Sequence, residues 1–276
     1  MQTVTFTCET ITPMFLNGAY GDNPELRAPS IKGALRFWWR AMNGHLTLEK
    51  LKNTEGVLFG NTERRSSFSM KIVEKEPLRI KSEFVLPHKE RSFTKQAIQV
   101  GQKFDIVFYC PKDATTQLIK NLFPLCCALG GFGGRSRRGF GGIKITNGQY
   151  PVTLEAILQL LNELVPQKFI LKDNAIHYLA TQRHEYPYIE KIEIGRANSN
   201  LTRKIGQATH EMNGIAGKYH YSRAVGSASP RFSTPIYVSA LETRNGLQSI
   251  VVTLHTPNVD KQIVQIQEQL KSKILI

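Results

Sequence analysis

The side chains best suited to chemistry in this sequence gather in one glycine-rich segment, residues 129–145. Six glycines and three arginines occupy residues 131–142. Glycine permits positive φ and lets a ligand approach the main chain, and arginine offers a planar charged fork that suits phosphate. The segment therefore predicts a loop that binds the backbone of a polyanion, with the rings of Phe132 and Phe140 available to stack on a base. The alternative is a flexible surface loop whose charges are only solvated.

This glycine-rich loop does not match the glycine loops that bind mononucleotides. Gly134 and Gly139 have the spacing of a P-loop, but Phe140 and Gly141 follow where Lys and Ser or Thr are required. The G-x-G that begins at residue 131 lacks its closing glycine, and Arg138 stands where a nucleophile elbow needs its second glycine. We therefore expect contacts to a phosphate backbone and no nucleotide cofactor.

A second candidate is a row of basic residues on the first predicted helix. Ser30 is a plausible N-cap for a helix that ends near residue 43. Lys32, Arg36 and Arg40 recur at i, i+4 and i+8 with no acidic residue between them, so like charges repel along one face and favour an external anion. The opposite stripe is apolar and should be buried: Ile31, Ala34, Leu35, Trp38, Trp39 and Met42. We expect Trp39 to be a core anchor, and Phe37, between the two faces, is left unassigned.

Catalytic and metal-binding patterns are weak. His184-Glu185 and His210-Glu211 begin like H-E-x-x-H but lack the second histidine. His45 and His220 could each serve as a general acid or base, yet lone histidines are more often structural. The acidic residues are scattered, so no carboxylate pair suggests itself. We expect no catalytic residue, no metal site and no cofactor.

Composition and charge favour a nucleic-acid partner. The 276 residues carry a formal net charge of +14. Residues 1–150 hold 22 Lys and Arg against 12 Asp and Glu, and the remainder holds 14 against 10. A basic balance of this size predicts attraction to nucleic acid or to anionic surfaces. The four cysteines form no metal or disulfide pattern, and no signal or membrane-spanning segment is visible, so we expect a soluble cytoplasmic protein.

The predicted elements indicate an α+β protein. Alternating residues 2–11 predict a half-buried strand, and further strands are expected at 67–74, 78–86, 95–100, 103–110 and 143–145, with a second helix at 113–129. This β-α-β-β-α-β order is that of a ferredoxin-like domain over residues 1–148. Helices at 154–165 and 259–274 and strands at 236–240 and 250–254 suit a second ferredoxin-like domain over residues 149–276, reduced or irregular. Residues 167–233 could not be assigned.

Several of these motifs together resemble a known family. Residues 29–40 read P-S-I-K-G-A-L-R-F-W-W-R, residues 57–60 read V-L-F-G, and the glycine-rich loop follows the second helix. This combination resembles the RAMP superfamily of CRISPR proteins, and especially the first-numbered RAMP subunit of the type III-B effector, the Cmr complex. The segment A-S-P-R at 228–231 is similar to part of the second domain of that subunit.

The resemblance implies tandem ferredoxin-like, RRM-related domains and a non-catalytic RNA-binding subunit that holds guide RNA (crRNA) near its 3′ end. The other RAMP subunits of the Cmr complex would be its partners, and direct contact with target RNA is left open. We expect the RNA to be bound by nine residues: Ser30, Lys32, Arg36, Arg40, Gly133, Gly134, Arg135, Arg137 and Arg138. Two alternatives stay open, a metal-free endoribonuclease that processes guide RNA precursors and an RNA-binding scaffold unrelated to CRISPR.

Overall fold

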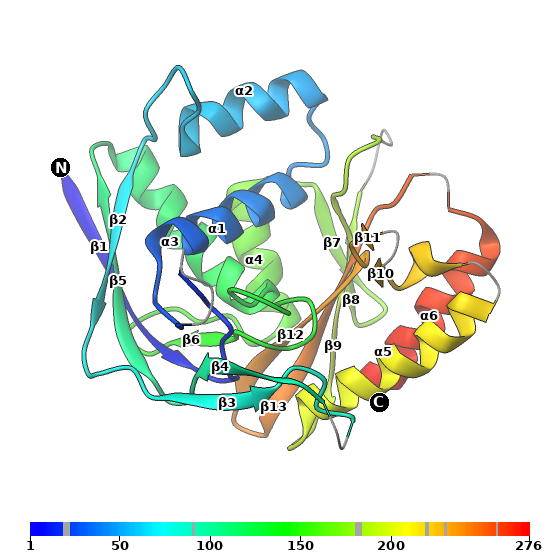
Figure 1. Cartoon of the computed structure of the whole chain (residues 1–276). Helices are drawn as coiled ribbons and strands as arrows, with labels where there is room; N and C mark the ends of the chain where they lie inside the picture. The colour runs from blue at the N-terminus through cyan, green and yellow to red at the C-terminus, as the bar shows by residue number, and fades with distance from the viewer. Residues whose placement is uncertain (19–22, 90–91, 180–183, 219–220, 229–230, 258) are drawn as a thin grey trace.

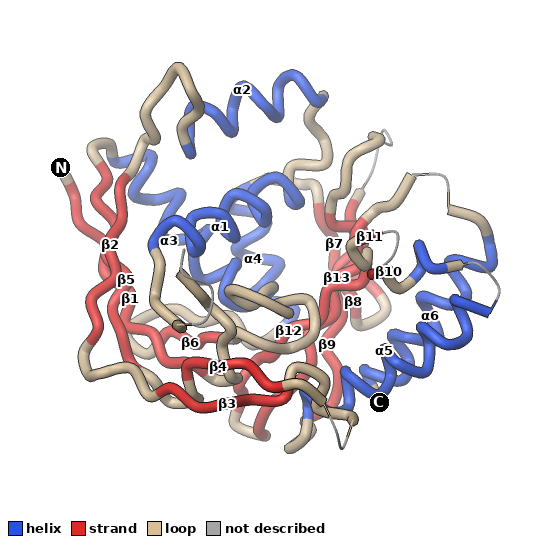
Figure 2. Tube along the Cα trace, viewed as in Figure 1, coloured by secondary structure: helices blue, strands red, loops and turns tan. Residues whose placement is uncertain are grey.

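Two antiparallel sheets and three helices between them form the centre of the molecule. The computed structural model describes residues 1–18, 23–89, 92–179, 184–218, 221–228, 231–257 and 259–276. His220 and residues 229–230 of the A-S-P-R segment lie outside these ranges. Figure 2 shows helices α1, α3 and α4 between the two sheets, with α5 and α6 on the outer side of the second sheet. The expectation of a mixed α+β protein is confirmed.

The first sheet has the strand order β2-β5-β1-β6 and is antiparallel throughout. Its strands are β1 (Gln2–Thr10), β2 (Ser69–Glu74), β5 (Lys103–Cys110) and β6 (Ile143–Ile145). Val4, Phe6 and Cys8 of β1 pair with Phe108, Ile106 and Phe104 of β5, and all six side chains are buried. The period-two pattern therefore predicted both the strand and its buried face.

Three helices follow strands of the first sheet. They are α1 (Ala28–Met42), α2 (Leu48–Phe59) and α3 (Asp113–Leu129). In Figure 1, α1 and α3 lie against the sheet and α2 lies outside α1. The side chain of Trp39 is 6% exposed, and its ring meets that of Phe59 edge to face with centroids 6.1 Å apart. The expectation that Trp39 is a core residue is confirmed.

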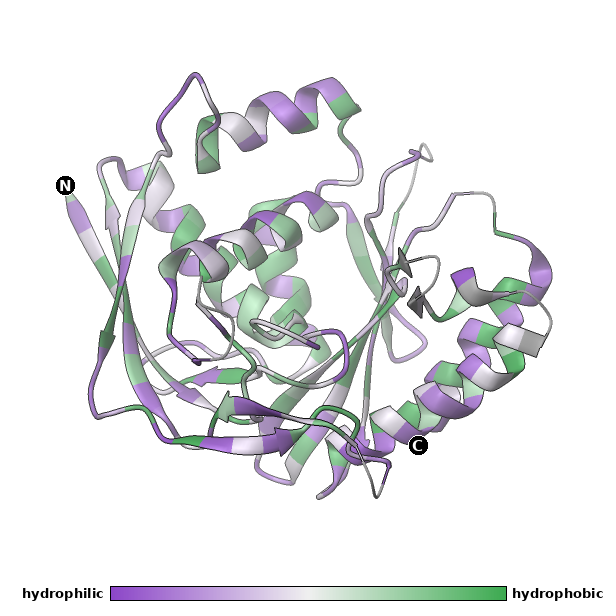
Figure 3. Cartoon of the chain, viewed as in Figure 1, coloured by the Kyte–Doolittle hydropathy of each residue, from purple (hydrophilic) through white to green (hydrophobic). Residues whose placement is uncertain are grey.

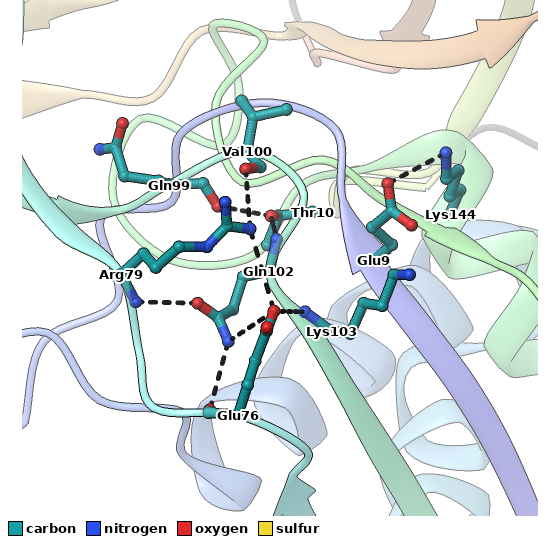
Figure 4. A network of polar contacts seen from close by, with 9 residues as sticks. All are labelled: Glu9, Thr10, Glu76, Arg79, Gln99, Val100, Gln102, Lys103 and Lys144. Carbon is teal, nitrogen blue, oxygen red and sulfur yellow. Dashed lines mark hydrogen bonds and ion pairs between the residues drawn. The ribbon is translucent and has the colours of Figure 1, made fainter.

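A two-stranded ribbon, β3 (Ile80–Phe84) and β4 (Thr94–Ile98), extends from the first sheet as a separate sheet. The buried side chain of Gln102 fixes its base: Oε1 accepts from Arg79 N at 2.8 Å and Nε2 donates to Glu76 O at 3.4 Å. Thr10 Oγ1 accepts from Gln102 N at 2.9 Å (Figure 4). The ribbon is thereby tied to the end of β1.

The second sheet has the order β12-β13-β9-β8-β7. Its strands are β7 (Phe169–Lys172), β8 (Ala175–Tyr178), β9 (Ile189–Ala197), β12 (Ile236–Thr243) and β13 (Gly246–Leu254). Helix α4 (Leu154–Leu164) packs on its inner side, and α5 (Leu201–Lys218) and α6 (Lys261–Leu275) on its outer side. The short elements η1 (Ser222–Ala224), β10 (Ser227–Ala228) and β11 (Arg231–Phe232) connect α5 to β12.

The hydrophobic core continues across the predicted domain boundary. One buried cluster contains residues of β1, α1 and α3 together with residues of α4, β9, β12 and β13. The helices between the sheets are accordingly among the most hydrophobic parts of the ribbon in Figure 3. A second cluster lies between the outer face of the second sheet and helices α5 and α6. The division of the chain near residue 148 stays a prediction.

Candidate nucleic-acid interface

A pocket of about 400 Å³ opens where α1, residues 15–17, the glycine-rich loop and β12 meet. We call it the α1–loop pocket. Thirteen residues line it: Phe15, Leu16, Asn17, Ser30, Ala34, Phe37, Trp38, Gly131, Gly133, Gly134, Ser136, Arg137 and Tyr237. Of the nine predicted RNA-binding residues, the pocket brings together four: Ser30, Gly133, Gly134 and Arg137.

Ser30 lines this pocket from the first turn of α1, but it does not cap the helix. The helix begins at Ala28, Arg27 is the N-cap residue, and no side chain caps the end. Pro29 has a fixed φ and no N–H to satisfy, so it fits the first helical turn and the helix starts before Ser30. The N-cap prediction for Ser30 is wrong. Ser30, Ala34 and Phe37 instead share the face of α1 that lines the pocket.

The basic row of α1 lies on another face and is compensated from α2. Glu55 of α2 accepts ion pairs from Arg36 Nε at 3.3 Å and from Arg40 Nε at 3.4 Å. Arg36 Nη2 also donates to Gly60 O at 2.7 Å, and the Lys32 ammonium lies 5.1 Å from the ring centre of Phe68. The interpretation of an uncompensated row is therefore wrong, because the carboxylate comes from the next helix. None of the three side chains lines the α1–loop pocket.

The glycines of the loop are required first by the loop's own fold. A Cβ on Gly131 would lie 2.0 Å from Phe140 O, and one on Gly133, whose φ is +90°, would lie 2.4 Å from Phe15 O. A Cβ on Gly134 would meet Phe15 at 3.4 Å, an ordinary contact. Gly134 is also exposed, so it is the glycine at which a ligand can approach the main chain.

Phe132 and Phe140 are 1% and 3% exposed. Phe132 belongs to the main core and Phe140 packs on Phe15 with ring centres 5.0 Å apart. Neither ring can stack on a base, so that prediction is wrong. Accessible aromatic surface in the α1–loop pocket comes instead from the half-buried Phe37, whose ring stacks on the buried ring of Tyr237 with centres 6.0 Å apart.

The three arginines of the loop point to two sides. The Arg137 guanidinium lies 5.3 Å from the ring centre of Phe37 and 5.4 Å from that of Tyr237, and it donates to Thr234 O. Arg138 Nη2 donates to Val225 O at 3.0 Å. Arg135 and Arg138 line a second pocket, formed with the segment after β3 and with α5. We call it the α5–loop pocket.

Positive charge in the loop has no acidic partner. Within the described residues, no Asp or Glu forms an ion pair with Arg135, Arg137 or Arg138. Burial lowers the pKa of all three, and burial together with the charges of Arg135 and Arg137 lowers the pKa of Arg138 to about 10. The guanidiniums still carry a proton at neutral pH, so the loop presents three desolvated cations. An anion bound there would stabilise them.

Of the two candidate acid–base residues, the structure describes only His45. His45 lies between α1 and α2, outside both loop pockets, and burial, with the charges of Lys168 and His184, lowers its pKa. Its Nδ1 is buried and has no hydrogen-bond partner in the described part of the chain. Among the residues that the structure describes, no cluster of three or more His, Cys, Asp or Glu could hold a metal ion.

Nine of the thirteen residues that line the α1–loop pocket were not among the predicted RNA-binding residues, and three of these nine are polar: Asn17, Ser136 and Tyr237. Ser136 could have been found from its place among the loop arginines. Tyr237 could not, because it lies about 100 residues away in a strand whose residues alternate between two buried faces. Its hydroxyl donates to Gly131 O at 3.3 Å and so fixes the start of the loop.

The first sheet has the order β2-β5-β1-β6, and the glycine-rich loop lies between helix α3 and strand β6. This part of the chain also matches a known protein family. Residues 7–144, half of the chain, match the family model of the RAMP superfamily. The chain belongs to the RAMP superfamily.

Curated relatives come from Pyrococcus furiosus. The chain is 29% identical over 175 residues to the CRISPR system Cmr subunit Cmr1-2, across 51% of this chain and 93% of that protein. It is 31% identical over 157 residues to the subunit Cmr1-1, across 51% of this chain and 46% of that protein.

Solved structures extend the likeness of the fold over nearly the whole chain. The crystal structure of Cmr1 from Pyrococcus furiosus in its apo form has a TM-score of 0.66 at 19% identity, across 99% of this chain and 97% of that one. A chain in the cryo-EM structure of the type III-B Cmr-beta bound to cognate target RNA has a TM-score of 0.64 at 10% identity, across 98% and 99% of the two chains. At such identities the likeness establishes the fold. No helix of the described residues has the length and apolar character needed to cross a membrane.

Proposed function

We propose that this protein is a non-catalytic RNA-binding subunit of a type III-B CRISPR RNA-guided interference (Cmr) complex, and that it holds guide RNA near its 3′ end. The kinship with Cmr1 subunits supports the complex and its other RAMP subunits as partners. The Cmr-beta relative is described as bound to cognate target RNA, so target RNA is a second candidate ligand.

One observation supports the RNA-binding role: Arg137, which forms no ion pair with an acidic residue in the described part of the chain, lies in a pocket beside the partly exposed ring of Phe37. In the α1–loop pocket, Arg137 supplies a cation beside Phe37 and Tyr237. Ser30 and the exposed main chain at Gly134 border the same space. A phosphate beside Arg137 with a base against the ring of Phe37 fits this arrangement. Such contacts give position and affinity without reading sequence, as a protein that accepts many guides requires.

The basic row of α1 extends this path. Arg36 and Arg40 share one carboxylate, Glu55, and their side chains remain 39% and 46% exposed. Together with Lys32 they would contact phosphates that leave the α1–loop pocket along the helix. These contacts are exposed to solvent and therefore weaker than those of the loop.

The test is RNA affinity across a salt series. Each phosphate contact to a single strand contributes about 0.7 to the slope of log affinity against log salt concentration. Arg137→Gln should weaken binding similarly for all sequences and flatten the slope by about 0.7. Arg244→Gln is the matched control, because it removes one positive charge at the exposed β12–β13 turn. Equal effects of the two variants would refute the assignment of RNA to the α1–loop pocket.

The non-catalytic part of the proposal has its own test. His45→Ala should leave cleavage of target RNA by the assembled complex within about threefold, roughly 0.6 kcal/mol, because His45 lies outside both loop pockets. A hundredfold loss with intact assembly would show a catalytic role. Incubation of the pure protein with labelled repeat RNA in EDTA tests the alternative of a metal-free endoribonuclease, for which a discrete product is required. Mass spectrometry of co-purifying proteins tests the alternative of a scaffold unrelated to CRISPR.

The same proposal includes two ferredoxin-like domains, residues 1–148 and 149–276. In the first half, β1, β2, β5 and β6 take the places of the four strands of that fold, in its order and with α1 and α3 as its helices. In the second half, β9, α5, β12, β13 and α6 follow the same sequence of elements, and β8 stands beside β9 where a fourth strand would lie. A cytoplasmic location follows from membership of a Cmr complex.

A further inference from the structure

The α5–loop pocket lies on the other side of the glycine-rich loop from the α1–loop pocket. Four segments of the sequence form it: the loop with Arg135 and Arg138, the segment after β3 with His88 and Lys89, α5 with Thr209 and His210, and residues between 226 and 234. Figure 1 shows the end of the β3–β4 ribbon beside α5. The pocket has a volume of about 400 Å³, within the range of sites that bind small molecules, and has room for a phosphate with its ribose.

The charged residues that the structure describes in this pocket are all basic. The described lining includes Arg135, Arg138 and Lys89 with two histidines, and no Asp or Glu is among these described residues. The rings of His88 and His210 have centres 5.0 Å apart. Burial, followed by the charges of His210, Lys89 and Arg135, lowers the pKa of His88, so its ring is neutral at pH 7 while the arginines stay charged.

Several polar atoms of the pocket are buried without a partner. Within the described residues, Nδ1 and Nε2 of His88, Nε of Arg135 and Oγ1 of Thr209 are inaccessible to solvent and form no hydrogen bond. Each such atom is unfavourable unless a bound group satisfies it. They come from three of the four segments, so one group in the pocket could accept from Arg135 Nε, from Thr209 Oγ1 and from one ring nitrogen of His88, since a neutral imidazole donates from only one nitrogen. A tetrahedral phosphate, with oxygens directed to different sides, fits this better than a planar carboxylate.

The fold holds these donors in place. Gly206 of α5 faces His88, and a Cβ at this position would lie 2.7 Å from His88 Nδ1. Arg135 has a φ of +57°, unusual for a residue other than glycine, and Arg138 N donates to its carbonyl at 2.8 Å. That turn directs Arg135 and Arg138 to the α5 side while Arg137 faces the α1 side. A main-chain conformation of this kind persists where the surrounding structure requires it.

We propose that the α5–loop pocket is a second RNA subsite that binds one phosphate group of the strand, through Arg135, Arg138, His88 and His210. It deepens the proposed function and rests on it for the identity of the ligand as RNA. The loop would then hold the strand from both sides, with Arg137 at one phosphate and Arg135 and Arg138 at another.

The first experiment uses inorganic pyrophosphate and the histidine ring signals in NMR spectra of the full chain, assigned with His88→Gln and His210→Gln. Pyrophosphate should shift the signals of His88 and His210 in a saturable way and leave that of His45 in place. Arg135→Gln should weaken this binding about tenfold, since it removes a charge-assisted hydrogen bond. Arg244→Gln, the matched control, removes one positive charge at the exposed β12–β13 turn and should leave this binding unchanged. No saturable shift, or equal shifts of His45, would overturn the phosphate site.

The second experiment tests RNA as the source of the phosphate. A single-stranded RNA should displace pyrophosphate from the pocket, and Arg135→Gln and His210→Gln should each weaken RNA binding about three- to tenfold. If pyrophosphate binds but RNA neither displaces it nor loses affinity in these variants, the pocket serves free phosphate compounds and the RNA subsite is refuted. In that case a loss of affinity in Arg137→Gln would leave the α1–loop pocket intact as the RNA site. An acidic peptide that displaces pyrophosphate better than RNA does would also overturn the inference.

Discussion

At the scale of single residues, a buried ion pair joins helix α6 to the second sheet. Lys271 of α6 is 1% exposed, and its ammonium pairs with Glu193 of β9 at 3.1 Å and with Glu268 at 2.7 Å. Burial alone would raise the pKa of Glu193, but the hydrogen bonds and charges of Lys191 and Lys271 hold it below its ordinary value. The buried ion pair therefore fixes α6 on the second sheet.

This pair makes stability depend on pH. Because the pKa of Glu193 is lower in the folded state, its contribution is present above the unfolded pKa, near 4.5, and is lost as pH falls through the folded value. Glu193→Gln should lower the free energy of unfolding by about 2 kcal/mol at pH 7, since Lys271 keeps its charge in a buried place. The difference from the wild type should shrink below pH 4. Urea unfolding of the two proteins at several pH values measures the loss of stability and its pH dependence. A loss that stays constant with pH would show that the Glu193 carboxylate is not its cause.

A substitution of Trp39 tests how α1 packs in the core. Its ring is buried against Phe59, so Trp39→Ala should lower the free energy of unfolding by about 3–5 kcal/mol. Leu48→Ala is the control, because Leu48 is 47% exposed and its truncation should have little effect. Denaturant unfolding of the two variants compares them. A Trp39 variant with unchanged stability and impaired RNA binding would mean that the ring contacts RNA.

Among the elements, the glycine-rich loop needs glycine for two reasons, its own fold and the approach of RNA to its main chain. Substitutions at Gly131 and Gly134 distinguish the two. A Cβ on Gly131 would collide with Phe140 O at 2.0 Å, whereas one on Gly134 meets only ordinary contacts. Gly131→Ala should therefore lower the melting temperature strongly. Gly134→Val should leave the fold intact and lower RNA affinity, because it keeps every charge but blocks approach to the main chain.

The salt dependence of RNA affinity shows whether Gly134→Val weakens binding by blocking the main chain or by removing a phosphate contact. Its slope of log affinity against log salt should stay within about 0.2 of the wild type, unlike that of Arg137→Gln. Calorimetric melting comes first, to establish that the variant is folded. A folded Gly134→Val with unchanged affinity would place the RNA away from the exposed face of the loop. Gly133 is unsuitable for this experiment, because its positive φ and its contact with Phe15 O serve the loop itself.

At the scale of the whole molecule, the two halves have separate sheets but share one hydrophobic core. Tyr237 and Leu241 of β12 belong to the cluster between the sheets, and Ile236 and Val238 of the same strand belong to the cluster under α5 and α6. Gly139 N of the loop donates to Val238 O at 2.9 Å, so the second half also supports the candidate site. We expect one calorimetric unfolding transition for the full chain. Two separated transitions would show that the halves unfold independently and that the shared core contributes little.

The sequence by itself determined the elements whose signal is local. Residues 103–110, 113–129 and 143–145 form the strand, helix and strand that were predicted, because each side-chain period lies within one segment. It also determined where the glycines and arginines gather, and hence the general position of the candidate site. Within residues 167–233, the buried residues of α5 do recur at helical spacing, so that local signal was present and was missed. The strands β7 and β8 are only four residues long, and β9 is partly buried and pairs with the distant β13, so they carried little local signal.

Only the tertiary structure decided what the charges face. Glu55 compensates Arg36 and Arg40 from a different helix, and Thr234 and Val225 accept hydrogen bonds from Arg137 and Arg138 across about 90 residues of sequence. Such partners cannot be found by periodicity, because hydrogen bonds and ion pairs depend on distance in space and carry no fixed spacing along the chain. For the same reason, three arginines that look alike in sequence are divided between two pockets on opposite sides of one loop.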